Sequence, residues 1–207
     1  ILNSDEYNLI LGGVEDDNLN GTSGKDLMLG FGGSDVLDGE DGDDLIYGGF
    51  GDDSLRGGNG DDELYGGLGE DDLWGESGND KLYGGNHDDK LYGEAGNDEL
   101  YGEDGSDDLY GGDGDDKLFG GEGNDYLYGN NGNDYLEGGN GRNHMYGGEG
   151  DTLLSAEKIP TICTEKTETI HSTEETVLTI CTAVKAMITS QAVSYTHLRA
   201  HETTLHL

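Results

Sequence analysis

The hydrophobic positions of this chain recur every nine residues. Between Gly12 and Ser155, sixteen nine-residue units follow one another without insertion or deletion. The eighth position of each unit is apolar, the first is always Gly, and the sixth is Asp in fourteen units. The fourth position is Gly except at Glu15 and His87. A nine-residue period fits neither an α-helix nor a heptad coiled coil, and glycines at fixed offsets would interrupt both.

Each unit instead predicts a tight turn followed by a very short strand. Two glycines and an Asp within six residues are typical of a turn with positive φ, and the x-Leu-Tyr segment that follows is typical of a strand. One such strand cannot bury its single apolar side chain alone. The units are therefore expected to stack as a solenoid.

The charged residues at position seven indicate how many units make one coil. If two units form a coil, residues eighteen apart become neighbours on adjacent parallel strands. The resulting position-seven columns are Glu63, Lys81, Glu99, Lys117 and Asp72, Lys90, Asp108. Both columns alternate in charge, whereas a nine-residue coil would place Lys81 beside Lys90. The sequence therefore predicts an all-β fold of about eight 18-residue coils.

The same spacing produces two aromatic columns at position nine. They are Tyr47, Tyr65, Tyr83, Tyr101, Phe119 and Trp74, Tyr92, Tyr110, Tyr128, Tyr146. Cross-strand packing explains these columns without any ligand. A glycan-binding role on the surface of an adhesin is the alternative.

Composition narrows the classes of function. The chain has 46 acidic and 10 basic residues and a formal net charge of −36, which opposes binding to nucleic acid or, by electrostatics, to an anionic membrane. Only 31% of its residues are hydrophobic, and no apolar run approaches the length of a membrane span. Paired acids such as Asp61 and Asp62 recur in many units, so they resemble a structural element rather than a unique acid/base pair. We expect no catalytic activity in this chain.

The acidic turns predict a bound cation. Carboxylates packed in successive turns repel one another, and turns of Asp side chains and exposed carbonyl groups offer only oxygen ligands. Calcium suits such a site, since magnesium demands octahedral geometry and zinc prefers His or Cys.

The units resemble the calcium-binding nonapeptide of RTX proteins, Gly-Gly-x-Gly-x-Asp-x-U-x, where U is a bulky apolar residue. Residues 57–65 (GGNGDDELY) and 111–119 (GGDGDDKLF) match it in full. The resemblance implies a right-handed parallel β-roll with calcium bound in the turns between units n and n+2. The implied ligands are position-six carboxylates and carbonyls of turn residues such as Gly57, Gly60, Gly111 and Gly114.

The carboxylate role is carried over to fourteen residues and up to about twelve calcium ions. These residues are Asp17, Asp26, Asp35, Asp44, Asp53, Asp62, Asp71, Asp80, Asp89, Asp98, Asp107, Asp116, Asp125 and Asp134. Asn143 and Thr152 replace the carboxylate in the last two units, so sites there are expected to be weak or absent. Glu15 and His87 displace a position-four Gly, which leaves the geometry of those turns open.

The chain divides into four segments by composition. Residues 1–11 are expected to be a degenerate unit or cap, and residues 12–155 form the repeat array. Residues 156–192 are Thr-rich and contain Cys163 and Cys181, whose pairing the sequence leaves open. Residues 193–207 resemble the translation of a sequencing-library adapter, so no function is assigned to them. Because the chain begins at Ile1, we expect a fragment of a longer protein.

The RTX resemblance implies a bacterial protein exported by a type I secretion machinery and folded by calcium outside the cell. One alternative is that the parent protein is an RTX toxin or enzyme whose active module lies elsewhere: a haemolysin or adenylate cyclase toxin, a metalloprotease, a lipase or a mannuronan epimerase. Another alternative is an RTX adhesin. Contact with a membrane or a glycan would then depend on other parts of the protein or on the aromatic columns.

Overall fold

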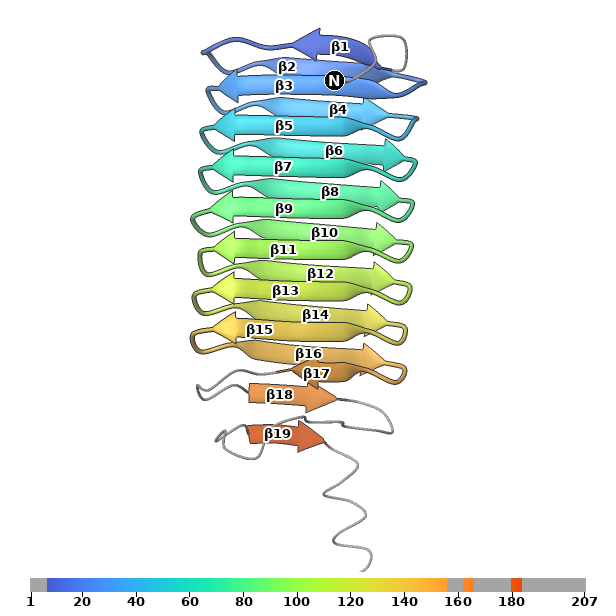
Figure 1. Ribbon diagram of the computed structural model, residues 1–207, viewed down its shortest axis with the longest axis vertical. Helices are drawn as coiled ribbons and strands as arrows, with labels where there is room; N and C mark the ends of the chain where they lie inside the picture. Colours follow the sequence, from blue (N-terminus) through green and yellow to red (C-terminus); the bar gives the residue numbers. More distant parts are fainter. Residues whose placement is uncertain (1–6, 156–161, 166–179, 184–207) are drawn as a thin grey trace, which may run out of the picture.

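The computed structural model describes residues 7–155, 162–165 and 180–183. These residues form a stack of short strands joined by tight turns (Figure 1). Within them, no helix has the length and apolar character needed to cross a membrane. The strands are β1 (Asn8–Leu11), β2 (Asn18–Thr22), β3 (Asp26–Gly32), β4 (Val36–Glu40), β5 (Leu45–Phe50), β6 (Ser54–Asn59), β7 (Glu63–Leu68), β8 (Asp72–Ser77), β9 (Lys81–Asn86), β10 (Lys90–Ala95), β11 (Glu99–Asp104), β12 (Asp108–Asp113), β13 (Lys117–Glu122), β14 (Tyr126–Asn131), β15 (Tyr135–Asn140), β16 (His144–Glu149), β17 (Leu153–Ser155), β18 (Ile162–Glu165) and β19 (Ile180–Ala183).

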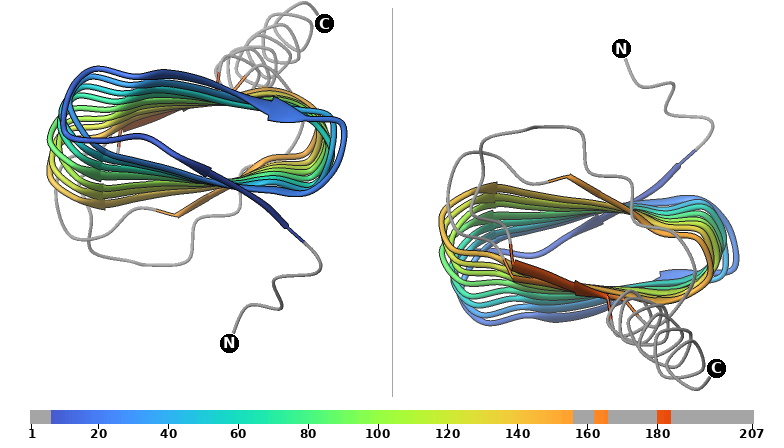
Figure 2. Two further views of the ribbon diagram at one scale, coloured as in Figure 1. Left: turned by 90° about the horizontal axis from the view of Figure 1, so that it is seen from above. Right: turned by 90° about the horizontal axis from the view of Figure 1, so that it is seen from below.

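Two parallel sheets face each other across a narrow interior (Figure 2). The odd-numbered strands β1 to β17 form one sheet, and the even-numbered strands β2 to β18, followed by β19, form the other. Neighbouring strands pair in strict 18-residue register, as Leu64 with Leu82 and Leu82 with Leu100. The predicted β-solenoid of about eight 18-residue coils is confirmed.

The core consists of one apolar side chain per unit. Position-eight residues from Met28 to Met145 are fully buried, and Leu154 is nearly so. Ile10 and Leu19 pack against this row at the N-terminal end, where they are partly buried. Because side chains alternate along a strand, the residues at positions seven and nine point away from the core.

The outward columns lie as the 18-residue register predicts. Lys81 stands between Glu63 and Glu99, and Lys117 Nζ lies 2.7 Å from a Glu99 carboxylate oxygen. Lys90 stands between Asp72 and Asp108. In both aromatic columns successive rings are nearly parallel, with centroids 4.6 to 5.6 Å apart. Cross-strand packing therefore accounts for both columns.

Two strands beyond the repeats extend the even-numbered sheet. β18 pairs with β16, and β19 pairs with β18, again eighteen residues further along the chain. This register places the backbone of Cys163 opposite that of Cys181. The remainder of the Thr-rich segment and the proposed adapter sequence, 193–207, lie outside the described residues.

Candidate metal centre

The position-six aspartates form two buried rows, one along each series of turns. From Asp26 to Asp134 these residues are at most 3% exposed, although their side chains are ionisable. Burial of a carboxylate is unfavourable unless each oxygen has a donor or a cation. The partners of the two oxygens therefore decide what the rows can bind.

One oxygen of each carboxylate is held by the backbone of the preceding coil. The Oδ1 atom accepts a hydrogen bond from the N–H of the position-six residue eighteen positions earlier, as Asp62 does from Asp44. Twelve aspartates, from Asp35 to Asp134, share this arrangement, with N···O distances of 2.7 to 3.1 Å. Each carboxylate therefore links two coils and has a fixed orientation.

The other oxygen has no partner in the same twelve residues. Their Oδ2 atoms are buried and receive no hydrogen bond. These atoms belong to Asp35, Asp44, Asp53, Asp62, Asp71, Asp80, Asp89, Asp98, Asp107, Asp116, Asp125 and Asp134. An anionic oxygen in this situation is stabilised by a proton or by a cation.

The position-one glycines leave the space in which these oxygens meet backbone carbonyls. A Cβ atom added to Gly30 would lie 2.3 Å from Asp35 Oδ2 and 2.6 Å from the carbonyl oxygen of Gly48, one coil later. At Gly111, the corresponding distances to Asp116 Oδ2 and the Gly129 carbonyl oxygen are 2.4 and 2.8 Å. Position one must therefore be Gly, because carboxylate and carbonyl oxygens converge where a side chain would begin.

Position four is Gly because successive turns stack backbone on backbone. Gly60 has a φ of +142°, and a Cβ atom there would lie 1.7 Å from the Gly42 carbonyl oxygen. His87 occupies the same position with a φ of 83°, and its N–H donates to the Asp104 carbonyl oxygen at 2.7 Å. The turn at His87 thus keeps a left-handed residue and its inter-coil hydrogen bond without Gly.

Burial raises the pKa of the eleven position-six aspartates from Asp44 to Asp134. Desolvation is the main cause, and neighbouring carboxylates add to it, as Asp44 does for Asp62. The pKa reaches about 8 at Asp80 and Asp89 and about 7 at Asp71. At Asp44 and Asp98 it is about 6. Without a cation, the rows therefore favour protons at a pH where free carboxylates are ionised.

The aspartates of the first two units differ from the other twelve. The Asp17 Oδ2 atom accepts a hydrogen bond from the Gly13 N–H at 2.6 Å, and the Asp26 Oδ2 atom accepts one from the Thr22 N–H at the same distance. Their second oxygens are therefore already satisfied by the backbone. These two members of the predicted ligand set lack the buried, unpartnered oxygen that distinguishes the rest.

The C-terminal end of the rows is formed by uncharged residues. Asn143 keeps the inter-coil link, because its Oδ1 atom accepts the Asp125 N–H at 2.9 Å. Its Nδ2 atom, which is a donor, takes the place of the second carboxylate oxygen and lies 3.3 Å from the Gly139 carbonyl oxygen. Thr152 is buried with a hydroxyl that lacks a partner. Neither residue supplies an anionic ligand.

The donor set fits a hard cation that binds backbone oxygens as well as carboxylates. Among the described residues, no group of three or more His, Cys, Asp or Glu side chains is placed to hold a metal. The carbonyl oxygens of Gly48 and Gly129 lie beside the space that the Oδ2 atoms of Asp35 and Asp116 border, so a cation there would meet both kinds of oxygen. Mixed carboxylate and carbonyl coordination is characteristic of calcium.

A second polar column, at position five, was not predicted from the sequence. Its side chains accept hydrogen bonds from the backbone of the following coil, the opposite direction from position six. Asp61 accepts from the Asn79 N–H at 2.8 Å, and Asn97 accepts from the Asp115 N–H at 2.7 Å. Reading this column at 18-residue spacing, where short polar acceptors recur, would have found it.

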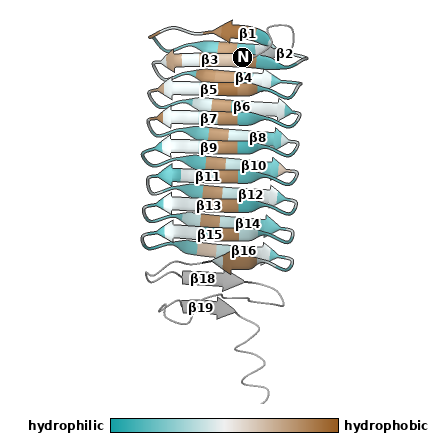
Figure 3. Cartoon of the chain, viewed as in Figure 1, coloured by the Kyte–Doolittle hydropathy of each residue, from teal (hydrophilic) through white to brown (hydrophobic). Residues whose placement is uncertain are grey.

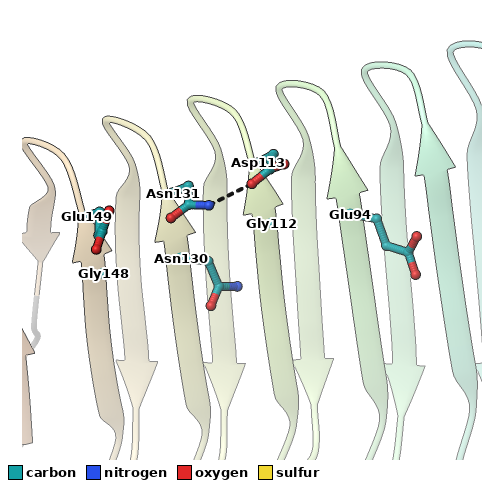
Figure 4. A pocket seen from close by; sticks show the side chains of 7 residues that line it. All are labelled: Glu94, Gly112, Asp113, Asn130, Asn131, Gly148 and Glu149. Carbon is teal, nitrogen blue, oxygen red and sulfur yellow. Dashed lines mark hydrogen bonds between the residues drawn. The ribbon is translucent and has the colours of Figure 1, made fainter.

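An open groove of about 580 Å³ lies on the even-numbered sheet, near the ends of β10 to β16 (Figure 4). Asp113, Asn131 and Glu149 are among its lining residues, and Asn131 Nδ2 donates to Asp113 Oδ1 at 2.7 Å. The lining includes none of the position-six aspartates. The groove is thus separate from the carboxylate rows.

Comparison with protein families assigns the repeats. A model of the RTX calcium-binding nonapeptide repeat, four copies long, matches residues 11–46, 47–82, 65–100, 83–118 and 119–154. The chain belongs to the RTX repeat family. A search of curated proteins found no significant match to the chain. The β-solenoid and the family together identify the repeat array as calcium-binding.

Proposed function

We propose that this RTX array is a calcium-dependent folding module of an exported bacterial protein, and that it has no catalytic activity of its own. The observation that carries the proposal is the series of twelve buried Oδ2 atoms without partners. Each lies beside a position-one Gly, in a space that a cation can share with backbone carbonyl oxygens. Calcium would complete these turns, and its binding free energy would become folding free energy.

The proposed ligands are the twelve aspartates with unpartnered Oδ2 atoms, from Asp35 to Asp134, together with turn carbonyls. About twelve ions would contribute a charge of roughly +24 and offset most of the negative charge of the repeats. Asp17 and Asp26 are weaker candidates, because backbone N–H groups already occupy their second oxygens.

The same electrostatics support export before folding. In a calcium-poor cytosol, carboxylate repulsion and desolvation oppose formation of the solenoid. Outside the cell, sites with a Kd on the order of 10⁻⁴ to 10⁻³ M, which is the range of extracellular calcium modules, would fill. A type I secretion machinery and an extracellular location are the expectations that follow from RTX membership.

The activity of the parent protein would reside in another module, such as that of an RTX toxin or enzyme. The adhesin alternative receives less support, because stacked rings in each aromatic column cover one another's faces. Tyr65, for example, lies between Tyr47 and Tyr83 with centroids 4.7 and 4.6 Å away. Mainly ring edges and hydroxyls remain for a ligand such as a sugar.

Circular dichroism of the whole chain during a calcium titration tests the proposal, with magnesium as the control. We expect a cooperative gain of β-sheet signal at millimolar calcium and little change with magnesium. A chain that is already folded in chelator at pH 7.5, or one that stays unfolded at millimolar calcium, would show that calcium does not drive folding.

A further inference from the structure

The outer face of the odd-numbered sheet changes character along the solenoid. On β1, β3 and β5 the outward residues of positions seven and nine are apolar, and they form what we call the apolar face: Leu9, Leu11, Leu27, Leu29, Leu45 and Tyr47. Leu9 and Leu11 are 61% and 52% exposed. On β7, β9, β11 and β13 the position-seven column carries Glu63, Lys81, Glu99 and Lys117 instead.

Three more large apolar side chains follow at the C-terminal ends of β3, β5 and β7. Phe31, Phe50 and Leu68 are 50%, 67% and 40% exposed, and Phe50 pairs with Leu68 across the sheet. Phe31 has a φ of 74°, in a region that bulky side chains rarely adopt. Figure 3 shows that hydrophobic colouring is widest at this end of the solenoid. The exposed apolar surface thus extends from the apolar face to the adjoining turns.

The opposite sheet of the same coils is mostly polar. There the outward residues of β2, β4 and β6 include Asn18, Asn20, Asp38, Ser54 and Arg56, with Val36 as the apolar exception. General degeneration of the first coils would affect both sheets alike. The large apolar residues are instead concentrated on one face, where Leu9 and Leu11 are exposed and Leu27, Leu29 and Leu45 are half-buried. An apolar patch of this kind marks a binding surface.

The charges around the apolar face select its partner. Residues 8–62 contain fourteen acidic and two basic residues. Lys25 forms an ion pair with Asp43 at 2.6 Å, and the Arg56 guanidinium lies over the Trp74 ring on the other sheet. Long-range repulsion therefore opposes a second copy of this chain, whose net charge of −36 would stay negative, at roughly −12, with about twelve calcium ions bound. A partner with basic groups beside an apolar surface would be attracted.

We propose that the apolar face docks a positively charged, amphipathic segment of another polypeptide. Leucines or aromatic residues of that segment would cover Leu27, Leu29 and Leu45, and its Lys or Arg side chains would lie near the acidic turns. This inference goes beyond calcium binding, which takes place inside the turns and leaves the outer surface of the sheet available.

A fluorescent helical peptide with leucines on one face and lysines on the flanks serves as the probe. Its binding to the calcium-loaded whole chain is measured by fluorescence anisotropy. The test variant is Leu27→Glu with Leu45→Lys, which continues the alternating column of Glu63 and Lys81. The matched control, Val36→Glu with Ser54→Lys, places the same charges on the opposite sheet, where Asp72 is the next neighbour of Ser54.

We expect the test variant to weaken peptide binding by about tenfold and the control variant to change it by less than about twofold. A peptide with glutamates in place of lysines should not bind. The proposal fails if the lysine peptide does not bind the chain without substitutions, if both variants weaken peptide binding equally, or if the glutamate peptide binds as tightly as the lysine peptide.

Two further measurements separate this partner from other occupants. The chain is tested for dimerisation and for binding to zwitterionic vesicles, with and without the substitutions Leu27→Glu and Leu45→Lys. If these substitutions abolish dimerisation or vesicle binding, the apolar face belongs to a second copy or to lipid, and the proposal is overturned. If Leu27→Glu with Leu45→Lys no longer gains the β-sheet circular dichroism signal when calcium is added, Phe50→Asn with Leu68→Asp serves as the test variant instead. This pair continues the column in which Asn86 donates to Asp104, and it should weaken peptide binding in the same way.

Discussion

The carboxylate of Asp62 joins its own coil to the previous one, because its Oδ1 atom accepts the Asp44 N–H at 2.7 Å. The N–H of Asp62 is in turn donated to Asp80 Oδ1 at 2.8 Å. This series of backbone links fixes one oxygen of each carboxylate and leaves the other in the space beside a position-one Gly. A cation would therefore meet ligands that the fold has already oriented.

Asp62→Asn is expected to remove a calcium ligand while preserving the fold of the turn. Asn143 shows that an amide at position six still accepts the inter-coil hydrogen bond. The substitution replaces the unpartnered oxygen with an NH₂ group, so calcium stoichiometry should fall by about one and the folding midpoint should shift to higher calcium. Isothermal titration calorimetry and circular dichroism measure the two effects.

Asp61→Asn is the matched control, since it removes one negative charge from the exposed neighbouring residue. Asn79 and Asn97 already occupy that column and accept the same hydrogen bond. Stoichiometry should be unchanged. An equal loss of calcium in both variants would mean that general charge, rather than position-six ligation, governs binding.

Acid is expected to stabilise the calcium-free solenoid. The pKa of Asp80 and Asp89 is raised to about 8 in the fold, well above the ordinary value of 3.8. The folded state therefore binds more protons than the unfolded state between about pH 4 and pH 8, so its stability rises as pH falls through that window. Circular dichroism in chelator should show more β-sheet at pH 4.5 than at pH 7.5.

Calcium and protons compete for the same carboxylates of the folded chain. The unfolded aspartates are already ionised between pH 8 and pH 6, so both ligands favour folding, and the calcium concentration at the folding midpoint should fall as pH falls through that range. A midpoint that rises as pH falls would indicate that the folded state does not take up protons at the buried aspartates.

Gly57→Ala is expected to destabilise the calcium-loaded fold by more than about 2 kcal/mol. The new Cβ atom would lie 2.3 Å from Asp62 Oδ2 and would fill the space proposed for the cation. Gly24→Ala is the control, since nothing lies within 4 Å of its added Cβ atom and its φ is not in the left-handed region. Urea denaturation of both variants at saturating calcium makes the comparison. Equal stabilities would mean that position one tolerates a side chain.

Glu103→Gly is expected to stabilise the calcium-loaded fold by up to about 1 kcal/mol. Glu103 has a φ of 74°, which disfavours a residue with a Cβ atom, and the next residue in its column is Gly121. Glu122→Gly, in ordinary strand conformation, should instead destabilise the fold by about 0.5 to 1 kcal/mol. Urea denaturation gives the change in the free energy of unfolding of each variant. Changes of opposite sign would support this expectation, and equal losses of stability would contradict it.

The sequence was sufficient to predict the coil length, because only an 18-residue spacing makes the column of Glu63 and Lys81 alternate in charge. It also predicted the aromatic columns and the position of the carboxylates. The hydrogen bonding of each carboxylate could not be predicted, since it depends on which oxygen faces the backbone of the adjacent coil.

The left-handed conformation at position two was also not foreseen. Glu94, Glu103 and Asn130 adopt positive φ there, and residue type alone does not signal it. The apolar face was present in the sequence as Leu9, Leu27 and Leu45, eighteen residues apart. The sequence alone did not show that these residues form a surface. That conclusion needed the two sheets, because the contrast with Asn18, Asn20 and Ser54 on the opposite side shows that the apolar residues are concentrated on one face.

The 18-residue register also determines what a change in the number of repeats would do to the surface. Adding or removing two units preserves which sheet every later strand joins. Adding or removing a single unit between β5 and β10 would exchange the sheets of all later strands, as if the far part of the rod were turned half a revolution. The groove on β10 to β16 and the apolar face lie on opposite sheets in this chain. After such a change they would lie on the same side of the solenoid. Even and odd repeat numbers therefore give differently arranged surfaces, so variants that change length by whole coils conserve the geometry of both.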